Sequence, residues 1–140
     1  MTLKLPSTQA RQYTTSRQLI AGDDFNNLVA QLNSEADGLT AGAGGTQAKA
    51  LQLGAAVNTV STVASANDSV KLPKGIPGLE VWIQNAGGGN SIQVFVYNTG
   101  TINNTDGAAT GVALAASLTA ATLYKCLRID PTNGDIWVSK

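Results

Sequence analysis

The sequence contains no histidine and a single cysteine, Cys126, so it lacks most of the side chains that bind zinc and other transition metals. Histidine is also the commonest general base near neutral pH. One cysteine cannot form an intrachain disulfide, which leaves burial and assembly as the sources of stability. The sequence therefore predicts a protein that is not an enzyme, with no catalytic residues, no metal site and no cofactor.

Charge is also scarce, because charged residues make up 13% of the 140-residue chain, about half the usual share. Nine basic and nine acidic residues cancel, so we expect no nucleic-acid partner, which would call for a concentrated basic face. No apolar run approaches the roughly 18 residues of a membrane span, and the first residues lack the apolar stretch of a signal peptide. We therefore expect no membrane partner and synthesis in the cytoplasm.

The first 22 residues form a basic segment in which Lys4, Arg11 and Arg17 are not balanced by any acidic residue. The segment holds too few large apolar side chains to build a packed element of its own. We interpret residues 1–22 as an extended arm. A merely disordered tail is the alternative that these residues leave open.

A helical pattern follows over residues 23–40, with Asp23 or Asp24 as the N-cap and Gly38 as a stop. Its apolar stripe recurs every three or four residues and consists of Phe25, Leu28, Val29, Leu32, Ala36 and Leu39. A helix this short depends on burying that stripe. Because the Gly/Ala run 41–45 predicts a hinge, we expect the stripe to mediate oligomerisation with another subunit; packing on the following domain is the alternative.

From residue 46 the apolar period becomes twofold, which is typical of β-strands. The expected strands cover residues 57–63, 70–72, 79–84, 92–97, 123–129 and 135–138. The glycines within 85–90 predict one hairpin turn, and 130–134 predicts another. The Ala-rich segment 107–122 predicts one or two short strands with a bend. The predicted fold class is mainly β with an N-terminal helix, in which residues 46–140 form an antiparallel β-sandwich or small barrel.

Two glycine-rich stretches and one acidic cluster are candidates for ligand binding. None of them matches the motif that its ligand would require. Residues 42–45 and 87–89 are not followed by the Lys-Ser/Thr pair of a phosphate-binding loop. Asp130, Asn133 and Asp135 do not follow the spacing of a calcium-binding loop. We interpret all three as hinge, loop and turn residues.

Aromatic side chains cluster in the β-region, where they fit either a core, a subunit interface or a stacking platform for a ligand. They are Trp82, Phe95, Tyr97, Tyr124 and Trp137. We expect the core or an interface for most of them. Trp82 and Tyr97 are the candidates for a ligand platform.

The order of strands and turn residues resembles that of small tailed-phage virion proteins known as head-decoration or head-fibre proteins. The matching segments are 46–53, 56–63, 70–73, 78–87, 92–97 and 136–138, preceded by Asp23–Val29. The likeness covers most of the chain and includes no catalytic signature. The sequence departs from the family pattern at 107–122. It implies a β-sandwich knob, commonly a homotrimer, whose N-terminal part grips the capsid; the residues themselves leave open whether the copies number two, three or more.

Taken with the sparse charge and the basic arm, the resemblance predicts a virion structural protein on the capsid exterior, assembled in the host cytoplasm. Its partners would be further copies of itself and the major capsid protein or another virion protein, with Lys4, Arg11 and Arg17 as the capsid-anchoring residues. The rival hypothesis is a receptor- or carbohydrate-binding module of a phage head or tail fibre. That module would hold a host-surface glycan through Trp82 and Tyr97.

Overall fold

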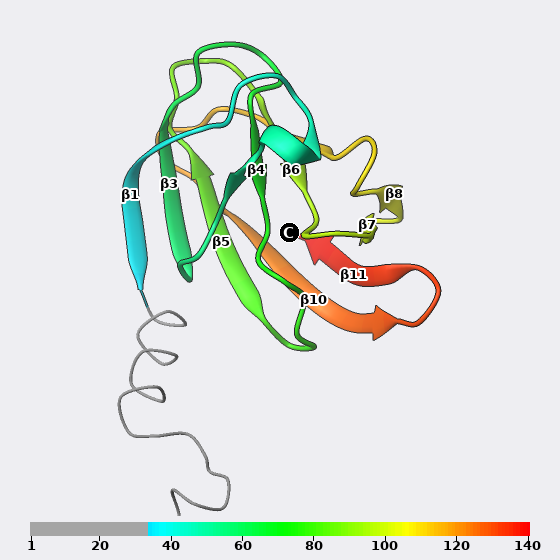
Figure 1. The fold of residues 1–140 in the computed structure, drawn as a ribbon. Helices are drawn as coiled ribbons and strands as arrows, with labels where there is room; N and C mark the ends of the chain where they lie inside the picture. The colour runs from blue at the N-terminus through cyan, green and yellow to red at the C-terminus, as the bar shows by residue number, and fades with distance from the viewer. Residues whose placement is uncertain (1–33) are drawn as a thin grey trace, which may run out of the picture. The chain divides into compact units, whose positions relative to one another are not determined.

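Strands make up nearly all the regular structure of residues 34–140, the part of the chain that the computed structural model describes (Figure 1). The strands are β1 (Glu35–Thr40), β2 (Leu51–Gln52), β3 (Val57–Thr62), β4 (Ser69–Lys71), β5 (Glu80–Asn85), β6 (Ile92–Phe95), β7 (Gly100–Ile102), β8 (Thr105–Asp106), β9 (Val112–Leu114), β10 (Thr122–Asp130) and β11 (Gly134–Ser139). A single 3₁₀ turn, η1 (Gln47–Lys49), precedes β2. The prediction of a mainly β protein is confirmed.

The strands form two sheets that enclose one core. The large sheet has seven strands in the order β1-β3-β5-β10-β11-β7-β8, and the small sheet has four in the order β2-β4-β6-β9. Both sheets mix parallel and antiparallel neighbours. The predicted purely antiparallel arrangement is therefore wrong.

The mixed pairing arises because the chain alternates between the sheets over its first six strands. In the large sheet β1, β3 and β5 run parallel, and in the small sheet β2, β4 and β6 do the same. Parallel neighbours need a crossover connection, and here the strand in the opposite sheet supplies it. The chain thus winds through three stacked coils before β9 and β10 return antiparallel to β6 and β5.

The predicted hairpin at residues 85–90 is wrong, because β5 and β6 lie in different sheets. Gly88 and Gly89 adopt positive φ angles of 69° and 102°, which turn the chain from one sheet to the other. The side-chain amide of Asn90 donates to the carbonyl of Val63 at 3.0 Å and ties this loop to the preceding coil. Glycines with positive φ occur in many kinds of sharp turn, so these glycines alone do not show which strands pair. The second predicted hairpin, at 130–134, is confirmed by the antiparallel β10–β11 pair.

The end of the predicted helix forms strand β1 instead. Ala36 aligns with Asn58 of β3, and Leu39 aligns with Val60 and packs against the core. Burial and pairing with β3 override the helical spacing of these two residues, since propensity is a weak local preference. The other stripe residues, Phe25, Leu28, Val29 and Leu32, lie outside the described residues, as does the arm.

The predicted hinge at 41–45 is wrong as well, because this segment packs into the β-domain. Ala41 is buried, and Gly42 exchanges backbone hydrogen bonds of 2.8 and 2.7 Å with Ser69. A Cβ atom at Gly42 would collide with the backbone of Lys49. The compact unit that contains this segment spans Ser34–Lys140, so the β-domain begins before residue 46.

Side-chain alternation places the core and the surface on opposite faces of β5. Val81 and Ile83 of β5 are fully buried, whereas Glu80 and Trp82 are exposed. The core also contains Val60, Tyr124, Cys126 and Trp137 from the large sheet and Val70, Ile92 and Val94 from the small one. Segment 107–122 contributes the short strand β9 and a turn, in agreement with its interpretation.

Truncation tests the revised boundary of the β-domain. A chain that starts at residue 46 lacks β1 and the buried Ala41, so we expect it to melt at a lower temperature than a chain that starts at residue 34, or without a cooperative transition. Circular dichroism melts of the two proteins make the comparison. Equal melting temperatures would show that β1 adds nothing to the domain.

A matched leucine pair tests the core. Leu53 is 2% exposed and Leu118 is 79% exposed. We expect Leu53→Ala to lower the free energy of unfolding by about 2–5 kcal/mol, because it leaves a cavity. Leu118→Ala should change it by less than about 0.5 kcal/mol. Urea unfolding of both variants measures the difference, and similar losses would contradict the core assignment.

Candidate interaction surface

A row of side chains on the outer face of the large sheet crosses strands β1, β3, β5 and β10 and ends just after β11. Trp82 on β5 is 41% exposed and aligns with Val57 on β3 and with Leu123 on β10. Glu35 on β1 aligns with Val57 at one end of the row, and Lys140 exchanges backbone bonds of 3.1 and 3.0 Å with Leu123 at the other. We call these five residues, Glu35, Val57, Trp82, Leu123 and Lys140, the central row.

The backbone beneath Trp82 is held on the β3 side by hydrogen bonds. Its amide donates to the carbonyl of Ala56 at 2.8 Å, and its carbonyl accepts from the side chain of Asn58 at 3.3 Å. Asn58 is fully buried and also donates to the carbonyl of Ala55 at 2.8 Å. A rigid strand of this kind presents an aromatic side chain in a fixed place, which lowers the entropy cost of binding.

Four charged residues lie on this face or at its end. Acidic Glu35 and Glu80 lie on β1 and β5, whereas basic Lys125 and Lys140 lie on β10 and just after β11. Lys125 and Glu80 are 3.5 Å apart and about half exposed, so their pairing contributes little stability. The central row therefore has an acidic residue at one end and a basic residue at the other, and the Glu80–Lys125 pair lies between its ends on β5 and β10.

The structure does not bring the two candidate platform residues together. Trp82 belongs to the large sheet, whereas Tyr97 follows β6 of the small sheet and lies 5.7 Å from the ammonium of Lys71. The other three aromatic residues, Phe95, Tyr124 and Trp137, are buried, as expected for a core. A platform on the large sheet would have to be built on Trp82 alone.

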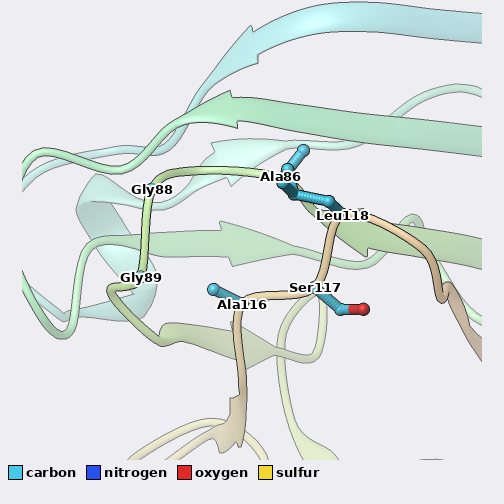
Figure 2. A pocket seen from close by; sticks show the side chains of 6 residues that line it. All are labelled: Ala86, Gly88, Gly89, Ala116, Ser117 and Leu118. Carbon is cyan, nitrogen blue, oxygen red and sulfur yellow. The ribbon is translucent and has the colours of Figure 1, made fainter.

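A shallow pocket of about 320 Å³ lies between residues 86–89 and the segment before β10 (Figure 2). It is lined by Ala86, Gly88, Gly89, Ala116, Ser117 and Leu118. The Ser117 hydroxyl accepts from the amides of Thr119 and Ala120 at 3.3 and 3.0 Å, so it already serves the local turn. The lining offers no charged or catalytic group to a ligand.

The acidic turn residues have structural roles. Asp106 accepts from the amides of Ala108 and Ala109, and Asp130 accepts from the amides of Thr132 and Asn133. These backbone hydrogen bonds lower the pKa of both carboxyls, and Arg128 lowers that of Asp130 further.

No metal cluster is present within residues 34–140, where no three His, Cys, Asp or Glu side chains are grouped to hold an ion. Asp135, one of the acidic residues considered for a cation, accepts from the amide of Gly75 at 2.8 Å. Burial raises the pKa of the Cys126 thiol, and the nearby negative charge of Asp135 adds to that effect. The described residues thus use these groups for structure.

No protein-family model, curated protein or solved structure matches the chain. Within residues 34–140 no helix is long and apolar enough to cross a membrane. Of the predicted site residues, the structure places Ala36 and Leu39 in β1 and Trp82 on the outer face, while Lys4, Arg11 and Arg17 lie outside the described residues. The sequence interpretation missed Val57 and Leu123 as neighbours of Trp82, because strand alternation shows which way a side chain faces and not which strand lies beside it.

Acid titration tests the turn carboxylates. Their folded-state pKa lies below the ordinary value of 3.8, so the stability they add is present above that pH and is lost as pH falls through the lower folded-state pKa. We expect the melting temperature to fall less between about pH 5 and about pH 2 in Asp106→Asn/Asp130→Asn than in the wild type. Glu35→Gln removes a strand carboxylate and serves as the control. A double variant with the wild-type acid profile would contradict the assignment.

Proposed function

We propose that this protein is a structural subunit of a tailed-phage virion that decorates the capsid or forms short fibres on it. It acts by attachment and self-association. The segments that carry the resemblance support the proposal, because 56–63, 78–87 and 92–97 contain β3, β5 and β6, strands of the stacked coils. The likeness therefore falls on the part of the chain that forms the scaffold of the β-domain.

The observation that carries the proposal is the exposed apolar centre of a rigid sheet face. Trp82, flanked by Val57 and Leu123, stands on a strand paired on both sides. Aromatic anchors surrounded by a polar and charged rim are typical of protein–protein interfaces. A face of this kind suits a subunit that works by contact with other proteins.

The N-terminal part would supply attachment. Lys4, Arg11 and Arg17 remain the proposed capsid-anchoring residues, and Phe25, Leu28, Val29 and Leu32 the proposed oligomerisation residues. An oligomer whose arms bind together on a repeating lattice gains effective concentration without any single tight contact. The resemblance favours a trimer, and a mass measurement of the full chain counts the copies.

A glycan- or receptor-binding module is the second candidate, and the exposed Trp82 ring favours it. Gln84 and Thr59 face the same way as Trp82 by strand alternation and are aligned with one another. The Gln84 amide already donates to the carbonyl of Ser117 at 3.2 Å, so its side-chain oxygen and the Thr59 hydroxyl are the groups offered to sugar hydroxyls. Quenching or shifting of tryptophan fluorescence by oligosaccharides tests this function. Trp137 is buried, so the change would report on Trp82.

Particle decoration tests the proposed function. Deleting residues 2–19 should abolish occupancy on virions while the β-domain still folds, because that segment would carry the anchor. Replacing Lys4, Arg11 and Arg17 with Ser should weaken binding, most visibly at low salt, where exposed charges are least screened. Quantitative electron microscopy of decorated particles gives the occupancy. Full occupancy by the truncated chain would show that attachment runs through residues 34–140.

A further inference from the structure

We propose that the outer face of the large sheet pairs face to face with the same face of a second copy of this chain, about a two-fold axis that runs parallel to the strands. The virion function requires only that copies associate. The pairing adds which surface the copies use and a two-fold symmetry, in place of the three-fold symmetry that the resemblance favours, so the number of copies distinguishes the two.

The edges of the sheets are poorly suited to association. Edge strand β1 carries an irregularity between Ala36 and Leu39, where Gly38 has a φ of 69° and the Asp37 carboxylate accepts from its amide. The other edge strands are short, with two residues in β2 and in β8 and three in β9. Bulges, charges and short strands all discourage edge-to-edge pairing. Within residues 34–140, a sheet face is therefore better suited to association than a sheet edge.

The outer face of the large sheet has an apolar centre that a partner would cover. Val57 is 40% exposed and Trp82 is 41% exposed, and Leu123 and Val138 beside them are partly exposed. Leu127, further along β10, is 50% exposed. A central tryptophan among aliphatic side chains is the composition of an interface core.

The charges of the central row select a second copy as the partner and fix the axis. Glu35 lies at one end of the row and Lys140 at the other. A two-fold axis along the strands reverses the row, so Glu35 of one copy faces Lys140 of the other, twice. An axis across the strands would instead place like charges opposite each other, at an energetic cost. A two-fold interface uses the same patch on both copies, and the central row is self-complementary in that sense, while Glu80 and Lys125 pair within each copy.

The size of the face predicts a weak dimer. Five strands spaced about 4.8 Å apart, each about six residues long, cover roughly 20 Å by 20 Å, or on the order of 400 Å² per copy. A stable interface buries about 1,000 Å² or more in total. We therefore expect a concentration-dependent equilibrium with a dissociation constant on the order of micromolar or weaker.

The first experiment measures that equilibrium for the full 140-residue chain by sedimentation from about 1 µM to about 500 µM. Trp82→Ser should raise the dissociation constant at least about tenfold, because it removes the central anchor. Tyr97→Ser is the matched control, since Tyr97 is 37% exposed but follows a strand of the small sheet. That variant should leave the constant unchanged.

The second experiment reverses the charges of the row. Glu35→Lys and Lys140→Glu should each raise the dissociation constant by about two- to tenfold, more at low salt. The double reversal should restore it to within about twofold of the wild type. These two residues are at opposite ends of the row in one copy, so only contact between copies explains a rescue.

Several outcomes would overturn the pairing. They are a monomer at every concentration, an unchanged constant in Trp82→Ser, a double reversal without rescue, and a trimer. Association lost in Leu32→Asp but kept in Trp82→Ser would assign the contact to the predicted helix instead. A monomer whose tryptophan fluorescence shifts with oligosaccharide would assign the face to a glycan. The virion function is judged separately by particle occupancy, so the two ideas can fail independently.

Discussion

Strand β5 is the element on which the rest of the structure depends. It lies between β3, which runs parallel, and β10, which runs antiparallel, and so joins the coiled half of the large sheet to the returning half. Its inward side chains Val81 and Ile83 build the core, and its outward Trp82 builds the exposed face. Because the side-chain period is two, a slip of one residue would exchange core and surface. One register thus decides both the core and the exposed face.

Winding between two sheets imposes a second requirement, since each loop must carry the chain across the end of the core. Buried polar side chains hold these loops in place by hydrogen bonds to their backbone. Asn85 donates to the carbonyls of Asn90 and Leu114 at 2.8 and 3.1 Å and accepts from the amide of Gly87 at 3.1 Å. Such local bonds satisfy loop backbone groups that would otherwise be buried without partners. They also hold the loops closely enough to keep the coils stacked.

The large sheet consequently has two distinct sides. Its inner side shares the core with the small sheet, and its outer side carries the exposed Trp82 and Val57 in a row that ends in Glu35 and Lys140. That division suits a subunit that works through contacts with other proteins, which is how the proposed virion role and the proposed two-fold pairing are related. A surface on hydrogen-bonded strands suits such contacts, because the entropy cost of ordering it was met when the domain folded.

The sequence by itself determined the local properties of the chain. Alternation identified β3, β5, β6, β10 and β11 and the inward face of β5, and Asp130 to Gly134 identified a hairpin, because side-chain period and turn chemistry are properties of neighbouring residues. Only the tertiary structure decided which strands pair. Parallel stacking joins residues some twenty positions apart, such as Ala36 and Asn58, and no local pattern records that contact. Non-local pairing also explains why residues with a helical spacing form strand β1. It likewise brings Val57 and Leu123 beside Trp82.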